Sequence, residues 1–125
     1  MPSHRRLLLL IPPLALMGLI FVLSAQPDLD SGLGTIDLIG RKIIHFCEYA
    51  LLCWLWWRVF EPDLGASRAA LVAFLISSGY AATDELHQVF VEGRHGAPLD
   101  WVIDSAGAGV IALRLRLGLR RRTVA

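Results

Sequence analysis

The sequence predicts an all-α membrane protein, specifically a polytopic four-helix transmembrane bundle with short loops. Hydrophobic residues make up 55% of its 125 residues, and the mean hydropathy is +0.56. A soluble domain of this length could not bury so much apolar surface in its own core, whereas a bilayer could. The charged residues also gather at the ends of the apolar runs, which is typical of membrane proteins.

Four apolar runs are long enough to form transmembrane helices, which need about 20 residues each. They predict a single membrane domain over residues 1–125, with spans at about residues 7–24, 43–60, 66–88 and 99–117. Pro12 and Pro13 should kink the first span without ending it, because neighbouring helices can satisfy the freed backbone groups. An alternative is that the first run is a signal peptide, since basic residues precede it, although FVLSAQP is a weak cleavage site.

The basic residues predict how the spans are oriented, because Lys and Arg favour the cytoplasmic side. If both termini are cytoplasmic, nine basic residues lie at the inner ends of the spans and three at the outer ends. The inner set is Arg5, Arg6, Arg58, Arg68, Arg114, Arg116, Arg120, Arg121 and Arg122, and the outer set is Arg41, Lys42 and Arg94. We therefore expect a multi-pass protein of the inner (plasma) membrane with both termini in the cytoplasm.

Tryptophans and small residues have structural interpretations. Trp54, Trp56 and Trp57 lie near the inner end of the second span, and Trp101 lies at the outer start of the fourth, where interfacial anchors are common. The run SAGAG, residues 105–109, is typical of a strip that lets a helix approach its neighbour closely.

Polar residues of the last three spans share helix faces near the predicted outer ends. The spacings of three or four residues that place them on one face join His45 with Glu48, Asp84 with His87 and Gln88, and Asp100 with Asp104. A helix rises about 1.5 Å per residue, which predicts two layers of matching depth. The outer layer would hold His45, His87 and Asp100, and the deeper layer Glu48, Asp84 and Asp104.

This alignment predicts a polar pocket that opens outward. A carboxylate inside the hydrocarbon costs at least about 2.5 kcal/mol, so such groups normally face a bundle interior or a wet cavity. Interhelical hydrogen bonds in membrane proteins stabilise the fold by only about 0.6 kcal/mol on average. This small gain disfavours the alternative of a structural polar network without a ligand. The pocket candidates are Lys42, His45, Glu48, Asp84, Glu85, His87, Gln88, Arg94, Asp100 and Asp104. Arg94 is expected in a loop over the pocket, where its guanidinium could clamp a carboxylate or phosphate.

The same residues leave two chemical alternatives open. A metal ion could be held by His45, Glu48, Asp84 and His87, since such ligands on facing helices build metal sites in bundles. No H-E-x-x-H or C-x-x-C zinc motif is present. A His–carboxylate pair could also act as acid and base, so a membrane-embedded hydrolase or transferase, with or without a metal, is an alternative. A proton-coupled carrier is disfavoured, because its site should lie nearer the midplane.

Spaced motifs cover most of the chain. They are FVLSAQP at the end of the first span, K-x-x-H-F-x-E-Y at 42–49, D-E-x-H-Q-x-F at 84–90, Gly-Arg at 93–94, and D-x-x-x-D-x-x-G at 100–107. With these motifs the chain resembles the VanZ-like family of small bacterial membrane proteins. The resemblance implies an all-helical integral membrane protein and an association with low-level teicoplanin resistance, without a settled biochemical activity.

Residues and resemblance together lead to one functional expectation. We expect a bacterial inner-membrane protein that binds or acts on a cell-envelope component, such as a lipid head group or a lipid-linked cell-wall precursor. Teicoplanin carries a lipid tail and acts at the extracytoplasmic surface of the plasma membrane, where the predicted pocket would open. The net charge of +1 gives no reason to expect nucleic acid as a partner.

Overall fold

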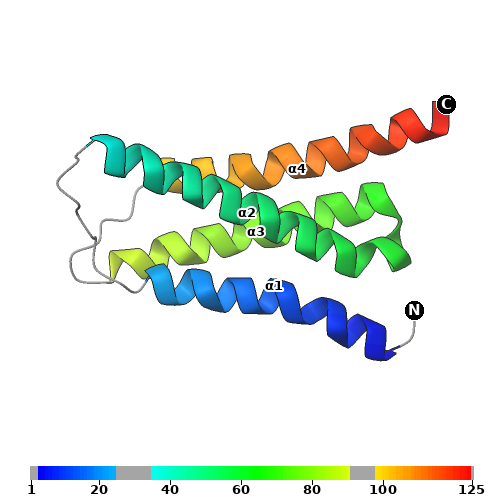
Figure 1. Cartoon of the computed structure of the whole chain (residues 1–125), viewed down its shortest axis with the longest axis horizontal. Helices are drawn as coiled ribbons and strands as arrows, with labels where there is room; N and C mark the ends of the chain where they lie inside the picture. The colour runs from blue at the N-terminus through cyan, green and yellow to red at the C-terminus, as the bar shows by residue number, and fades with distance from the viewer. Residues whose placement is uncertain (1–2, 25–34, 91–97, 125) are drawn as a thin grey trace.

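A computed structural model describes residues 3–24, 35–90 and 98–124, and these form four helices. The helices are α1 (Ser3–Ser24), α2 (Thr35–Leu64), α3 (Ala66–Val89) and α4 (Pro98–Val124). They run up and down along one common direction, so α1 begins and α4 ends at the same end of the bundle (Figure 1). The prediction of an all-helical chain is confirmed, since no strand occurs within the described ranges.

The helices extend beyond the predicted apolar spans. Helix α2 begins at Thr35 instead of near residue 43, and α4 continues to Val124 instead of ending near residue 117. The spans were delimited by apolar character, but Arg, Lys and Leu are good helix formers, so a helix can continue into a charged segment. Helix α1 runs through Pro12 and Pro13 without ending, as predicted.

A single glycine joins α2 to α3. Gly65 has φ of 76°, a left-handed conformation that other residues rarely adopt. Its N–H donates to the Glu61 carbonyl at 3.0 Å, and its carbonyl accepts from the Ala69 N–H at 2.9 Å. This short connection folds α3 back along α2, and the Trp57 indole N–H donates to the Ala66 carbonyl at 3.0 Å. The two helices are therefore fixed to each other at this end.

Small residues let α2, α3 and α4 approach one another closely. These three helices contact each other in every pairing, whereas α1 packs on α2 and α3. The buried face of α3 carries Ala66, Ala69, Ala70, Ala73, Ser77 and Ala81, and it continues with Asp84 and Gln88. Residues spaced by three or four positions lie on one helix face. The face that packs α3 into the bundle therefore also brings Asp84 into the interior.

Helix α4 makes its closest approach at Gly107. A Cβ atom added there would overlap the backbone carbonyl oxygen of Phe46 in α2. On the other side of α4, the Ser105 and Ser78 hydroxyls lie 2.8 Å apart, and the Trp101 indole donates to the Ser78 carbonyl at 3.0 Å. The predicted packing role of residues 105–109 is confirmed at this crossing.

One of the predicted interfacial tryptophans lies in the core. Trp56 is only 8% exposed and stacks on Phe60 with ring centroids 5.9 Å apart, so the prediction that it anchors α2 at a membrane surface is wrong. Neighbouring residues of a helix point about 100° apart, so Trp54, Trp56 and Trp57 cannot share one face. Trp54 and Trp101 are partly exposed.

The outside of the bundle is strongly apolar. Each helix exposes large apolar side chains, among them Leu19, Phe21, Ile43, Ile44, Leu71, Leu75, Val110 and Leu113. Two helical segments of the described chain, Ser3–Leu23 and Ile39–Leu64, are long and apolar enough to cross a membrane. An exterior of this kind is expected of a protein surrounded by lipid and is unusual for a soluble monomer.

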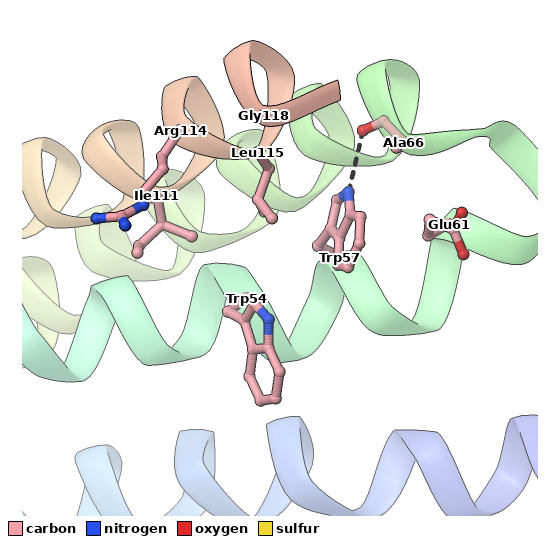
Figure 2. Close-up of a pocket in the computed structure, with 8 residues that line it drawn as sticks. All are labelled: Trp54, Trp57, Glu61, Ala66, Ile111, Arg114, Leu115 and Gly118. Carbon is pink, nitrogen blue, oxygen red and sulfur yellow. Dashed lines mark hydrogen bonds between the residues drawn. The ribbon is translucent and has the colours of Figure 1, made fainter. Parts of the chain in front are cut away.

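A cavity of about 430 Å³ lies between α2 and α4 near the end where α4 terminates (Figure 2). Its lining consists of Trp54, Trp57, Glu61, Ala66, Ile111, Arg114, Leu115 and Gly118. Trp54 is nine residues beyond His45, or about 14 Å along α2. This cavity is therefore separate from the predicted polar pocket.

The Gly107 crossing predicts an asymmetric response to two glycine substitutions. Gly107→Ala should lower the free energy of unfolding by about 1–3 kcal/mol, because overpacking forces the backbones of α2 and α4 apart. Gly79→Ala is the matched control, since nothing lies within 4 Å of an added Cβ at that α3 position, and it should be neutral or slightly stabilising. Equilibrium unfolding in micelles measures both. Equal effects of the two substitutions would contradict the close approach.

Candidate functional site

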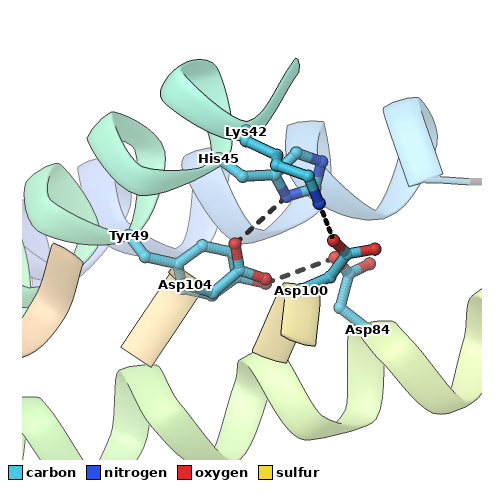
Figure 3. A network of polar contacts seen from close by, with 6 residues as sticks. All are labelled: Lys42, His45, Tyr49, Asp84, Asp100 and Asp104. Carbon is cyan, nitrogen blue, oxygen red and sulfur yellow. Dashed lines mark hydrogen bonds and ion pairs between the residues drawn. The ribbon is translucent and has the colours of Figure 1, made fainter. Parts of the chain in front are cut away.

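Polar side chains from three helices point toward one another near the starts of α2 and α4 (Figure 3). Helix α2 contributes three residues that are spaced by three and four positions and therefore share one face. Helix α3 contributes one residue near its end, and α4 contributes two residues four positions apart. We call these residues the polar cluster: Lys42, His45, Tyr49, Asp84, Asp100 and Asp104.

The inner part of the polar cluster is buried. Asp104 is fully buried, and Asp84 is 4% exposed. His45 Nδ1 lies 3.3 Å from Asp104 Oδ1, and the Tyr49 hydroxyl donates to Asp84 Oδ2 at 3.4 Å. Tyr49 is itself fully buried. Two carboxylates, one imidazole and one phenol thus meet where α2, α3 and α4 come together.

The buried carboxylate of Asp104 lacks hydrogen-bond donors. Neither of its carboxylate oxygens accepts a hydrogen bond, because the contact with His45 Nδ1 is close in distance but lies outside hydrogen-bond geometry. Leaving a buried polar group without a hydrogen bond costs about 1–3 kcal/mol, and more for a charged group. A position this unfavourable in a packed helix interface is typical of functional sites.

The outer part of the polar cluster is a half-exposed ion pair. Lys42 Nζ lies 2.8 Å from Asp100 Oδ1, and the two side chains are 30% and 29% exposed. Each residue lies one helical turn before its buried partner, Lys42 before His45 and Asp100 before Asp104. The pair therefore forms a solvent-accessible rim next to the buried groups, and surface ion pairs of this kind exchange partners at little cost.

Three side chains of the polar cluster hold ligand-type atoms close together. His45, Asp84 and Asp104 each offer a nitrogen or oxygen atom, and these atoms all lie within 4.8 Å of one another. Such a group can bind a cation, or it can move a proton between imidazole and carboxylate. No Ser or Cys takes part in the polar cluster of Figure 3.

The remaining candidates occupy different positions. His87 stacks on Phe21 of α1, with ring centroids 4.4 Å apart and planes inclined by 8°. Gln88 is buried, and Glu48 and Glu85 are half-buried. Arg94 lies outside the described residues. Of the predicted metal ligands, the structure brings together His45 and Asp84, and it adds Asp104 instead of Glu48 and His87.

The predicted assignment of the polar residues to an outer and a deeper layer is wrong in one respect. His45 was expected level with His87 and Asp100, but it contacts Asp104, which was expected one layer deeper. Counting residues along one span gives the depth of a residue within that span. It does not fix the offset along the bundle axis between neighbouring helices. Packing sets that offset, here through the contact of Gly107 with the Phe46 backbone.

Tyr49 is a cluster residue that the candidate set missed. Its position four residues after His45 places both on one face of α2, and that spacing is the signal that could have identified it. Tyrosine in an apolar run is ordinarily a packing residue, and the sequence gives no sign that its hydroxyl reaches a carboxylate from another helix.

No curated protein and no solved structure matches the chain. The sequence profile of the family described as VanZ/LLP1 matches residues 3–118, which include α1, α2, α3, most of α4 and every residue of the polar cluster. The chain therefore belongs to the VanZ/LLP1 family.

Proposed function

We propose that the chain is a four-span protein of the bacterial inner membrane, with both termini in the cytoplasm and the polar cluster near the extracytoplasmic end. Family membership and the two apolar helical segments support a membrane location. Exposed apolar side chains on α3 and α4 extend the apolar surface over the remaining helices. The excess of basic residues at the end where α4 terminates supports this orientation.

The function that this arrangement supports best is recognition of an anionic, lipid-linked component of the cell envelope at the outer surface. The observation that carries the proposal is the half-exposed Lys42–Asp100 pair beside the half-buried His45 and the buried Asp84 and Asp104. The Lys42 ammonium can leave Asp100 for a phosphate, because lysine binds phosphate as a point charge. Exposed Ile43 and Ile44 follow Lys42 on α2 and provide an apolar surface for the lipid's chains.

The proposal also accommodates the resistance phenotype associated with the VanZ-like family. A protein that binds or shields a lipid head group or a lipid-linked cell-wall precursor would act at the surface where teicoplanin acts. Arg94, which precedes α4 in the sequence, belongs to this proposal as a second phosphate-binding group.

A second candidate function is a membrane-embedded hydrolase or transferase that acts on a similar lipid, with or without a metal ion. It is favoured by the three ligand-type atoms of His45, Asp84 and Asp104 within 4.8 Å, because such groups can activate water. The two functions differ in outcome. A binding protein returns its lipid unchanged, whereas an enzyme would release a product and lose turnover when His45 is replaced by Gln.

The orientation predicts which end of the bundle can be labelled from outside the cell. In a background with Cys47→Ser and Cys53→Ala, an impermeant maleimide should label Ile39→Cys on intact cells. It should label Leu64→Cys only after the membrane is permeabilised, because Leu64 lies at the opposite end of α2. Both native side chains are exposed, at 52% and 39%. Labelling of Leu64→Cys on intact cells would contradict the orientation.

The head-group proposal predicts a specific role for Lys42. Short-chain phosphatidic acid titrated into the protein in zwitterionic micelles should bind about fivefold more weakly to Lys42→Gln, because one lysine near a lipid surface contributes about 1 kcal/mol. Asp100→Asn should strengthen binding, since it releases Lys42 from its ion pair. Arg68→Gln makes the same charge change as Lys42→Gln at the opposite end of the bundle. Equal weakening by Arg68→Gln and Lys42→Gln would contradict the proposed site.

A further inference from the structure

We propose that His45, Asp84 and Asp104 bind one divalent transition-metal ion, such as Zn²⁺ or Mn²⁺, in the interior of the bundle. The three residues come from three different helices, α2, α3 and α4, so the ion would link these helices to one another. This inference depends on the buried residues alone and does not require that the rim at Lys42 and Asp100 binds a lipid.

The distances suit a shared ligand. Metal–nitrogen and metal–oxygen bonds to Zn²⁺ are about 2.0–2.2 Å long, so two ligand atoms at a tetrahedral centre are roughly 3.4 Å apart. His45 Nδ1 and Asp104 Oδ1 are 3.3 Å apart. All three ligand atoms lie within 4.8 Å of one another, so small changes in the side-chain torsions of Asp84 and Asp104 would close the set around an ion.

The state of Asp104 is a second, independent observation. Its side chain is fully buried, and neither oxygen accepts a hydrogen bond. Buried charges in proteins are paired or coordinate metals. A metal ion between Asp104, Asp84 and His45 would use the lone pairs of Asp104 that the protein leaves without donors.

The charges of the cluster also favour a divalent cation. Asp84 and Asp104 bring two negative charges when ionised, and a neutral imidazole contributes no positive charge to balance that of Asp104. Lys42 is paired with Asp100 at the rim, with Nζ 2.8 Å from Oδ1. An ion of charge +2 would neutralise the two buried carboxylates and leave His45 uncharged, as metal coordination requires.

The ligand types indicate which ions are suitable. An imidazole nitrogen favours transition metals such as Zn²⁺, whereas carboxylates also suit Mn²⁺; magnesium and calcium prefer sets made only of oxygen. The Tyr49 hydroxyl, which donates to Asp84 Oδ2 at 3.4 Å, would orient that ligand from outside the coordination sphere. We therefore use Zn²⁺ and Mn²⁺ as probes.

The experiment uses the full chain purified in micelles, stripped with a chelator and then loaded with one metal. Elemental analysis after gel filtration should find about one Zn²⁺ per wild-type chain. The Mn²⁺-loaded protein should show nitrogen hyperfine coupling in pulsed electron paramagnetic resonance, because His45 supplies a nitrogen ligand. Asp104→Asn should weaken Zn²⁺ binding by more than about tenfold, since even residues outside the coordination sphere contribute that much.

Asp63→Asn is the matched control, because it makes the same chemical change at an exposed position at the other end of α2, outside the polar cluster, and should leave one ion per chain. Equal loss of Zn²⁺ in the two variants, or equal retention, would overturn the proposal and indicate adventitious binding. If Asp104→Asn does not fold, the wild-type spectrum decides: the absence of nitrogen coupling would also overturn it. Failure of the lipid proposal would appear in the Lys42→Gln titration and leave these results unchanged.

Discussion

The burial of two carboxylates where three helices meet is the constraint on which the rest of this structure depends. Asp84 and Asp104 lie inside the bundle close to His45, and Asp104 accepts no hydrogen bond. An ion pair removed from water often contributes less than apolar residues of similar volume would. The chain therefore retains in its buried interior an arrangement that is costly by this principle, and a ligand for these groups accounts for it more readily than structural reinforcement does.

The rest of the bundle holds this arrangement in place. The alanine-rich face of α3 brings Asp84 inward, and the Gly107 crossing sets α4 against α2 so that Asp104 meets His45. Helix α1 is attached from outside, where Phe21 stacks on His87 and the Tyr80 hydroxyl donates to the Met17 carbonyl at 2.6 Å. A rigid three-helix interior with an exposed rim can hold a small ligand, while the apolar exterior is suited to lipid.

Much of the fold could be predicted from the sequence, because the long apolar runs indicate the number and approximate position of the helices. The cluster could be predicted only as a set of candidate residues. Periodicity places His45, Asp84 and Asp104 on inward faces, but their pairing depends on the offset between helices. That offset comes from backbone contact at Gly107, which no residue pattern encodes by itself. Tyr49 escaped notice for a related reason, since its partner belongs to another helix.

The most direct test of this account is the free energy of unfolding of a variant in which His45→Leu, Asp84→Val and Asp104→Val remove the buried polar groups together. If the cluster is kept for a ligand, the metal-free variant should be at least as stable as the metal-free wild type, because apolar replacement removes the desolvation cost. A loss of more than about 3 kcal/mol, the scale expected when a buried pair that stabilises the fold is broken, would contradict the account. That result would identify the polar cluster as a structural network.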